Sequence, residues 1–173
     1  MLKEKFMGNN IGTFELKTSR MLVTDPCYGK EIWCTYTITD AKPGKWEGDV
    51  VMSDEGSWGN RVAELHVRHT EDYATDPTEK IDTVIGVDSG QAGFFDLDEF
   101  PDCGGADDKF YNEACEVTLS KGIPAGPVSN MGIVSSSGFG DGGYSLYVGR
   151  NDKGEVISAS LIFIDEVMED DYD

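Results

Sequence analysis

Alternation of apolar and polar side chains, with a period of two, runs through most of this chain. In residues 32–39, Cys34, Tyr36 and Ile38 alternate with threonines, and residues 63–68 alternate Ala, Leu and Val with charged or polar side chains. Successive side chains on a β-strand point to opposite faces, so this pattern predicts strands with one buried and one wet face. The 21 glycines of the 173 residues fit many tight turns between short strands.

The clearest hairpin is predicted for residues 144–149 and 155–164. Between them lies the sequence Asn-Asp-Lys-Gly (residues 151–154), with a glycine placed for the positive φ that such turns need. The segment from Val156 to Ile164 is apolar on both faces, so we expect it in the centre of a sheet. A further short apolar run, residues 81–87, follows the Asp76-Pro77 break.

One helix is predicted near residues 107–119. Asp107 and Asp108 stand at its N-terminal end, where a negative charge is favourable. Three apolar residues share one face at helical spacing: Phe110, Ala114 and Val117. The fold class expected is therefore mainly β, a single-domain sandwich or partly open barrel of short antiparallel strands with one helix. Residues 1–164 would form this domain, and 165–173 an acidic C-terminal tail.

The charge is strongly negative and unevenly distributed. Asp and Glu number 33 against 14 Lys and Arg, a net charge of −19. Residues 1–70 carry nine basic and ten acidic residues, whereas residues 71–173 carry five and twenty-three. This balance argues against direct binding of nucleic acid or of an anionic membrane surface.

The N-terminal sequence does not predict export, and no segment of the chain predicts a membrane span. No apolar stretch reaches the length of a signal-peptide core or of a membrane span, so we expect a cytoplasmic protein. The four cysteines form no C-x-x-C pair, and in a reducing compartment we expect free, mostly buried thiols. No cofactor is predicted.

A glycine-rich segment, residues 137–144, invites two interpretations. Gly138, Gly140 and Gly143 match G-x-G-x-x-G, but a strand follows where a dinucleotide site needs a helix. A tight, glycine-dependent turn between two strands is the simpler interpretation. The alternative is a ligand loop, in which backbone N–H groups and Asp141 face a pocket.

Several aspartates stand at predicted strand ends. Asp88, before Ser89 and Gly90, can close an Asx turn or hold a ligand. Residues 96–101 lack the spacing of a helix–loop–helix calcium site. A looser hard-cation site stays open, built from Asp25, Asp88, Asp96 and Asp141.

The remaining candidates for chemistry are two histidines and one cysteine. His66 and His69 are three apart on a predicted strand, so they should point to opposite faces, His66 toward solvent. No G-x-S-x-G motif appears, although a Ser-His-Asp site is recognised by geometry rather than by sequence. Cys27 lies in an Asp-Pro turn, where nearby carboxylates should raise its pKa and disfavour a nucleophilic thiolate.

Three groups of residues together carry a resemblance. They are residues 87–90 with 94–96, residues 137–144 with Tyr147, and residues 154–156. In them the chain resembles an uncharacterised bacterial family classed as a domain of unknown function, over about residues 84–165. Two positions depart from the family pattern: Ser145 stands where proline is common, and Gly93 where cysteine is frequent. The resemblance implies no activity. It implies that five residues come together, as turns or as a pocket: Asp88, Ser89, Gly138, Asp141 and Tyr144.

Two functions follow as expectations. The first is a non-enzymatic acidic protein that binds a basic protein partner, such as a nuclease. It would inhibit this partner by imitating the charge of nucleic acid, as phage anti-restriction and anti-CRISPR proteins do. Its acidic face would comprise Asp96, Asp98, Glu99, Asp102, Asp107, Asp108 and Glu113. The second is a small-ligand or divalent-metal domain, with hydrolysis as an option, built on the Asp88 and Asp141 loops.

Overall fold

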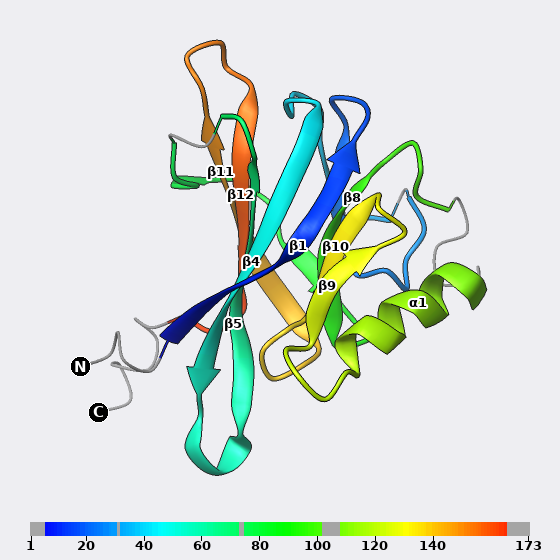
Figure 1. Cartoon of the computed structure of the whole chain (residues 1–173), viewed down its shortest axis with the longest axis vertical. Helices are drawn as coiled ribbons and strands as arrows, with labels where there is room; N and C mark the ends of the chain where they lie inside the picture. The colour runs from blue at the N-terminus through cyan, green and yellow to red at the C-terminus, as the bar shows by residue number, and fades with distance from the viewer. Residues whose placement is uncertain (1–5, 31, 73–74, 102–107, 166–173) are drawn as a thin grey trace.

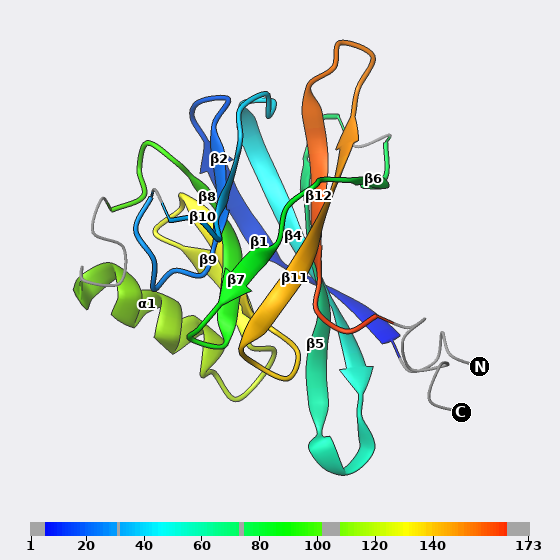
Figure 2. The same cartoon turned by 180° about the vertical axis from the view of Figure 1, so that it is seen from behind.

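Two antiparallel β-sheets packed face to face, with one helix on the outside, make up the described part of the chain (Figures 1 and 2). The computed structural model describes residues 6–30, 32–72, 75–101 and 108–165. The predicted mainly β class with a single helix is confirmed. Of the two architectures left open, the molecule adopts the sandwich, because neither sheet closes into a barrel.

The larger sheet has seven strands among the described residues. Its order is β1 (Phe6–Leu16), β4 (Gly44–Asp54), β5 (Asn60–His69), β12 (Val156–Ile162), β11 (Gly142–Arg150) and β6 (Glu79–Lys80), with β7 (Ile85–Val87) paired to the other end of β11. The predicted hairpin is confirmed as β11–β12. Strand β12 lies in the interior of the sheet, as its apolar sequence predicted.

The smaller sheet has five strands in the same ranges. Its order is β3 (Tyr36–Ile38), β2 (Met21–Thr24), β8 (Gln91–Asp96), β10 (Gly132–Ser136) and β9 (Ala125–Val128). The helix α1 (Asp108–Thr118) covers its outer face, at the right of Figure 1. Within the described ranges no helix lies over the outer face of the larger sheet.

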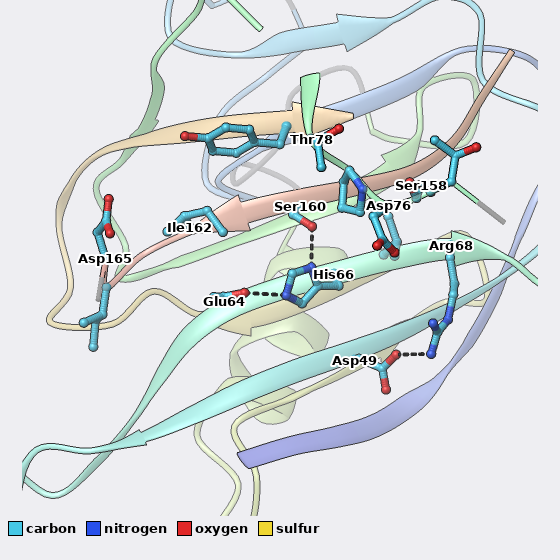
Figure 3. A pocket seen from close by; sticks show the side chains of 15 residues that line it. Asp49, Glu64, His66, Arg68, Asp76, Thr78, Ser158, Ser160, Ile162 and Asp165 are labelled. Carbon is cyan, nitrogen blue, oxygen red and sulfur yellow. Dashed lines mark hydrogen bonds and ion pairs between the residues drawn. The ribbon is translucent and has the colours of Figure 1, made fainter. Parts of the chain in front are cut away.

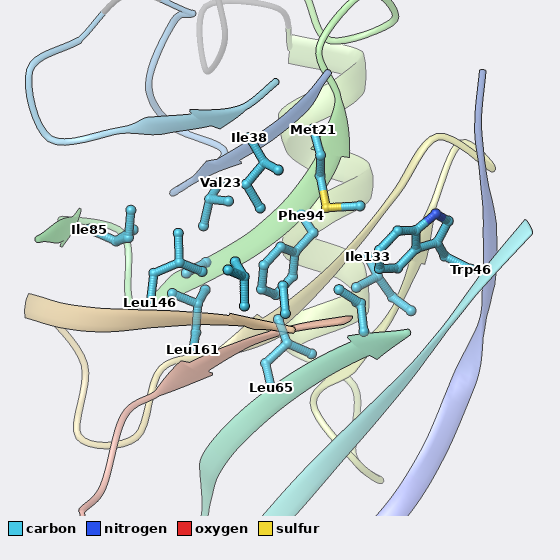
Figure 4. Close-up of a cluster of buried hydrophobic side chains, with 14 of the residues drawn as sticks. Met21, Val23, Ile38, Trp46, Leu65, Ile85, Phe94, Ile133, Leu146 and Leu161 are labelled. Atoms are coloured by element: carbon cyan, nitrogen blue, oxygen red, sulfur yellow. The ribbon is translucent and has the colours of Figure 1, made fainter. Parts of the chain in front are cut away.

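The main core fills the space between the two sheets (Figure 4). Trp46 and Leu65 from the larger sheet meet Phe94 and Ile133 from the smaller one, and all four side chains are fully buried. Burying a large apolar side chain contributes about 1.5–3 kcal/mol, so this layer is the principal source of stability. His69 also faces inward, with its ring edge-on to Trp46 at 5.9 Å between centroids.

A second apolar cluster joins the smaller sheet to the helix. On β8, Phe94 faces the other sheet and its neighbour Phe95 faces α1, where it packs against Phe100 and Phe110. This sheet is therefore buried on both faces, which explains the continuous apolar run in β8.

Two predicted strands are shorter in the structure than in the pattern. Of residues 32–39 only Tyr36–Ile38 pair, because the chain turns at Ile32, whose carbonyl accepts a hydrogen bond from Thr35 N–H. Of residues 81–87 only Ile85–Val87 form a strand, although Ile81 N–H donates to the carbonyl of Leu146 on β11 at 2.9 Å. Alternation shows which side chains are buried, but a strand also needs a partner along its edge. Among the described residues no helix is long and apolar enough to cross a membrane.

Candidate functional site

A groove of about 710 Å³ lies on the outer face of the larger sheet (Figure 3). Its floor comes from β4, β5, β11 and β12, and the segment 75–78 forms one wall. The volume falls in the range of ligand-binding sites, which run from about 300 to 1,000 Å³.

Period-two alternation on β5 and β12 places the groove side chains. On β5, Leu65 and Val67 point into the core, so Glu64, His66 and Arg68 point outward. The register sets three residues of β12 directly opposite these outward side chains: Ile162, Ser160 and Ser158. Acidic, basic and hydroxyl side chains thereby meet on one face.

His66 is the centre of a hydrogen-bonded chain in this groove. Its Nε2 lies 2.6 Å from Oε1 of Glu64, and its Nδ1 contacts the hydroxyl of Ser160 (Figure 3). An ionised carboxylate only accepts hydrogen bonds, so in the neutral ring Nε2 carries the hydrogen and Nδ1 accepts the Ser160 O–H. The prediction that His66 and His69 point to opposite faces is confirmed. His66 is half-buried rather than fully solvated.

Acidic groups dominate the groove. Asp49, Glu64, Asp76 and Asp165 line it, and Arg68 is the single arginine or lysine among the described residues that line it. Arg68 is already bound by two carboxylates: its Nε lies 3.1 Å from Glu47 and its Nη2 lies 3.0 Å from Asp49. The groove therefore keeps a negative character and favours a cationic occupant.

The Glu64–His66–Ser160 chain has the residue types of a nucleophilic triad, but its position on the sheet opposes acyl transfer. Such a reaction needs N–H donors aimed at the developing oxyanion. Ser160 lies on β12, whose backbone pairs with β5 on one side and β11 on the other. Amide groups near Ser160 are thus used by the sheet, and only 1% of the residue is exposed.

Asp25 joins the loop of residues 24–29 to the loop of residues 88–90. Its carboxylate is fully buried and accepts four hydrogen bonds: from Cys27 N–H at 2.8 Å, Asp88 N–H at 2.8 Å, Ser89 N–H at 2.7 Å and Ser89 Oγ at 2.6 Å. Each oxygen accepts two of them. The Asp88–Ser89 turn is therefore held by a carboxylate 63 and 64 residues away.

Two ionisable side chains beside Asp25 are shifted toward their neutral forms. Burial, reinforced by the neighbouring Asp25, raises the pKa of Cys27 from 9.0 to about 12. The predicted direction is therefore confirmed, with desolvation as its main cause. Tyr28 donates its hydroxyl to Asp88, and this hydrogen bond raises the pKa of Tyr28. Of the cysteines in the described ranges, Cys34 and Cys115 are free thiols like Cys27.

The glycine-rich segment forms the turn that joins β10 to β11. Gly138 and Gly140 have φ values of +58° and +114°, which side-chain-bearing residues rarely adopt. Tyr144 closes the turn, because its hydroxyl donates to the carbonyls of Gly140 at 2.6 Å and Ser137 at 3.2 Å. The simpler interpretation, a turn that needs glycine, fits this geometry.

The resemblance to the family implies that the loops of Asp88 and Asp141 lie close together, and the pairing of β7 with β11 places them side by side. Strand β7 pairs with β11 from Gly142 opposite Val87, so Asp88 and Asp141 occupy the next positions in the register. Both are exposed.

A family model described as "Protein of unknown function (DUF4241)" matches residues 14–161, most of the chain. The chain belongs to the DUF4241 family. The expected membership of a family of unknown function is thereby confirmed, and the match begins well before residue 84, where the resemblance started. No curated protein and no solved structure matches the chain.

In this DUF4241 chain the acidic face expected over residues 96–113 is partly internal. Asp96 is fully buried, where its carboxylate accepts the N–H groups of Lys17 at 2.8 Å and Asp98 at 2.9 Å. Asp96 therefore cannot contact a partner. It ends β8 and organises the turn that follows.

The other members of that face are largely paired. Asp98 binds Arg20, and Glu99 lies 2.9 Å from Lys17 Nζ, a hydrogen bond that raises the pKa of the Lys17 ammonium. Glu113 accepts Ser129 N–H at 2.7 Å and Ser129 Oγ at 2.6 Å. Asp108 begins α1, whereas Asp102 and Asp107 lie outside the described residues.

The four aspartates of the suggested cation site are not gathered by the DUF4241 fold. Asp25 and Asp96 lie at opposite ends of the β2–β8 pair, in which Met21 is opposite Asp96 and Thr24 is opposite Gly93. Within the described ranges no three His, Cys, Asp or Glu side chains are arranged to hold a metal ion.

Sequence reasoning missed Ser160 and the groove as a whole. The prediction that residues 156–164 are apolar on both faces is wrong for one face, because Ser158 and Ser160 stand two apart within the segment and both line the groove. Two hydroxyl residues at that spacing in an apolar strand are a signal for a polar stripe on one face. That stripe borders the groove.

Proposed function

We propose that this protein is a non-enzymatic binding protein that receives cationic side chains of a basic partner in the groove of its larger sheet. The observation that carries the proposal is the lining: in the part of the chain that the structure describes, it holds four carboxylates and one arginine that is already paired. Ile162 and Ile164 add apolar surface along the same groove. Lysine and arginine combine an apolar stem with a charged head, so they match both parts of this lining.

The partner that we propose is a nucleic-acid-binding enzyme, such as a nuclease. The protein would inhibit this enzyme in the way that phage anti-restriction and anti-CRISPR proteins inhibit their target enzymes. Enzymes of this class present lysine and arginine side chains in their nucleic-acid channels. The net charge of −19 would steer the encounter over long range, while the groove would supply the specific contact.

A titration with an octa-arginine peptide, followed by calorimetry and amide NMR, tests the groove. We expect shifts that centre on β5 and β12. The double variant Glu64→Gln/Asp76→Asn should weaken binding about tenfold, because two partly screened charge pairs together contribute roughly 1.4 kcal/mol. The matched control is Asp82→Asn/Asp88→Asn, which removes the same charge from two exposed positions outside the groove lining.

An equal loss of affinity in both double variants would mean that only net charge attracts the peptide, and the groove proposal would then fail. A competition assay tests the proposed partner class. The protein should displace DNA or RNA from the partner enzyme at low salt, and this displacement should weaken as the salt concentration rises. Salt-independent binding would contradict the proposed partner class.

A further inference from the structure

Two aromatic side chains from distant loops form an exposed pair at one end of the larger sheet. Trp58, in the β4–β5 turn, is 68% exposed, and Phe139, in the glycine-rich turn, is 55% exposed. Their ring centroids are 6.4 Å apart with an interplanar angle of 84°. The guanidinium of Arg61 lies over the Phe139 ring, 5.5 Å from its centroid. We call Trp58, Phe139 and Arg61 the aromatic patch.

Both loops are held in place by their own hydrogen bonds. Tyr144 and Ser137 fix the Phe139 turn through the carbonyl of Gly140, at 2.6 and 2.9 Å. In the other loop, Arg61 Nε donates to the carbonyl of Trp58 at 2.9 Å. These hydrogen bonds order the backbone of both turns, and an ordered turn loses less conformational freedom when it binds a partner.

The aromatic patch adjoins the groove. A Cβ placed on Gly138 would lie 3.1 Å from Phe163 Cβ and 3.2 Å from Ile164 Cγ1, so the Phe139 turn rests directly on this segment. Ile164 is also a lining residue of the groove. The turn that carries Phe139 therefore contacts a residue of the groove lining, which makes the aromatic patch and the negative groove neighbours on the molecule.

We propose that Trp58 and Phe139 are the apolar anchor of the partner interface and enter an apolar pocket of the same basic protein whose cationic side chain occupies the groove. This inference rests on the proposed function. Tryptophan, other aromatic residues and arginine are the types enriched in the energetically dominant parts of protein interfaces. The charge of −19 disfavours a second copy of this chain, or a nucleic acid, as the occupant.

The test is a selection of random dodecapeptides displayed on phage against the wild-type protein. Selected peptides are then synthesised, and their affinities are measured by fluorescence anisotropy. We expect peptides that combine large apolar residues with lysine or arginine. Trp58→Ser/Phe139→Ser should bind them at least tenfold more weakly, mainly through faster dissociation. The matched control, Trp33→Ser/Leu119→Ser, removes two apolar side chains that are 90% and 81% exposed, and should bind as wild type does.

Equal losses in the aromatic-patch and control variants would overturn the inference. A wild-type dimer in sedimentation velocity that dissociates in Trp58→Ser/Phe139→Ser would also overturn it, because the occupant would be a second copy. The two proposals fail separately. If only Glu64→Gln/Asp76→Asn lowers the affinity of the peptides, the result supports the groove proposal and refutes the apolar anchor. If only Trp58→Ser/Phe139→Ser lowers it, the result supports the apolar anchor and refutes the groove proposal.

Discussion

Ser160 and His66 lie directly opposite each other on β12 and β5, and the serine hydroxyl donates a hydrogen bond to Nδ1 of the imidazole. The two residues are 94 positions apart in the chain. Their pairing explains why a mostly apolar central strand can contain this serine, since its hydroxyl bonds to the imidazole, which also contacts Glu64. It joins the floor of the groove to one of its carboxylates.

We expect Ser160→Ala to lower the free energy of unfolding by about 1 kcal/mol, the typical contribution of one hydrogen bond. Octa-arginine affinity should stay close to that of wild type, because the serine carries no charge. Urea unfolding and calorimetry measure the two quantities. Covalent labelling of Ser160 in the wild type by a fluorophosphonate would contradict the proposed non-enzymatic function, since that reagent reports an activated serine.

Asp25→Ala should be among the most destabilising single substitutions, by about 3 kcal/mol or more. It removes the acceptor of four hydrogen bonds and leaves three backbone N–H groups without their partner. Asp88→Asn, at an exposed position in the same loop, should cost less than about 1 kcal/mol. Denaturant unfolding compares them, and similar losses in both variants would disprove the organising role of Asp25.

Gly140→Ala should destabilise the protein by about 1–3 kcal/mol through backbone strain alone. Its φ is +114°, yet an added Cβ would meet no atom within 4 Å. Gly138→Ala should cost at least as much, because its Cβ would also crowd Phe163 and Ile164. Gly8→Ala is the control, because the site has open space and no positive φ. Thermal unfolding of the three variants decides whether the turn conformation requires glycine.

The raised pKa of Cys27 predicts falling stability at alkaline pH. The folded protein keeps the thiol protonated up to a pKa of about 12, whereas the unfolded chain releases that proton near 9.0. Between these values the unfolded state binds fewer protons, so the free energy of unfolding decreases as pH rises from 9 toward 12. Cys27→Ser should show a shallower decrease. Alkylation of Cys27 at pH 8 should likewise be much slower in native than in urea-unfolded protein.

Metal chelation should leave the melting temperature unchanged. The turns at Asp88 and Asp141 are closed by hydrogen bonds within the protein, and in the described part of the chain no three ligand-type side chains converge. Scanning calorimetry with and without EDTA checks this. A melt that EDTA lowers in the wild type but not in Asp141→Asn would restore the cation site.

Local patterns predicted the elements better than the contacts between them. Phe110, Ala114 and Val117 indicated a helix face, and Phe110 and Ala114 are buried against the smaller sheet as that face requires. In contrast, the density of acids near Asp96 suggested an exposed face, although this carboxylate is fully buried. Composition reports how many charges a segment carries. It does not report which of them cap a backbone turn inside the fold.

By itself the sequence determined the class of the fold, the central position of β12, the opposite directions of His66 and His69, and the glycine turn before β11. These are local properties, because side-chain direction on a strand and backbone freedom at glycine depend only on near neighbours. Tertiary structure alone decided that Ser160 meets His66, that Asp25 holds Ser89, and that Trp58 packs on Phe139. Each of these pairs depends on strand order and register, which bring together residues that are far apart in the chain. The alternation of apolar and polar residues along a strand does not reveal which strand pairs with it, so the sequence alone could not predict these contacts.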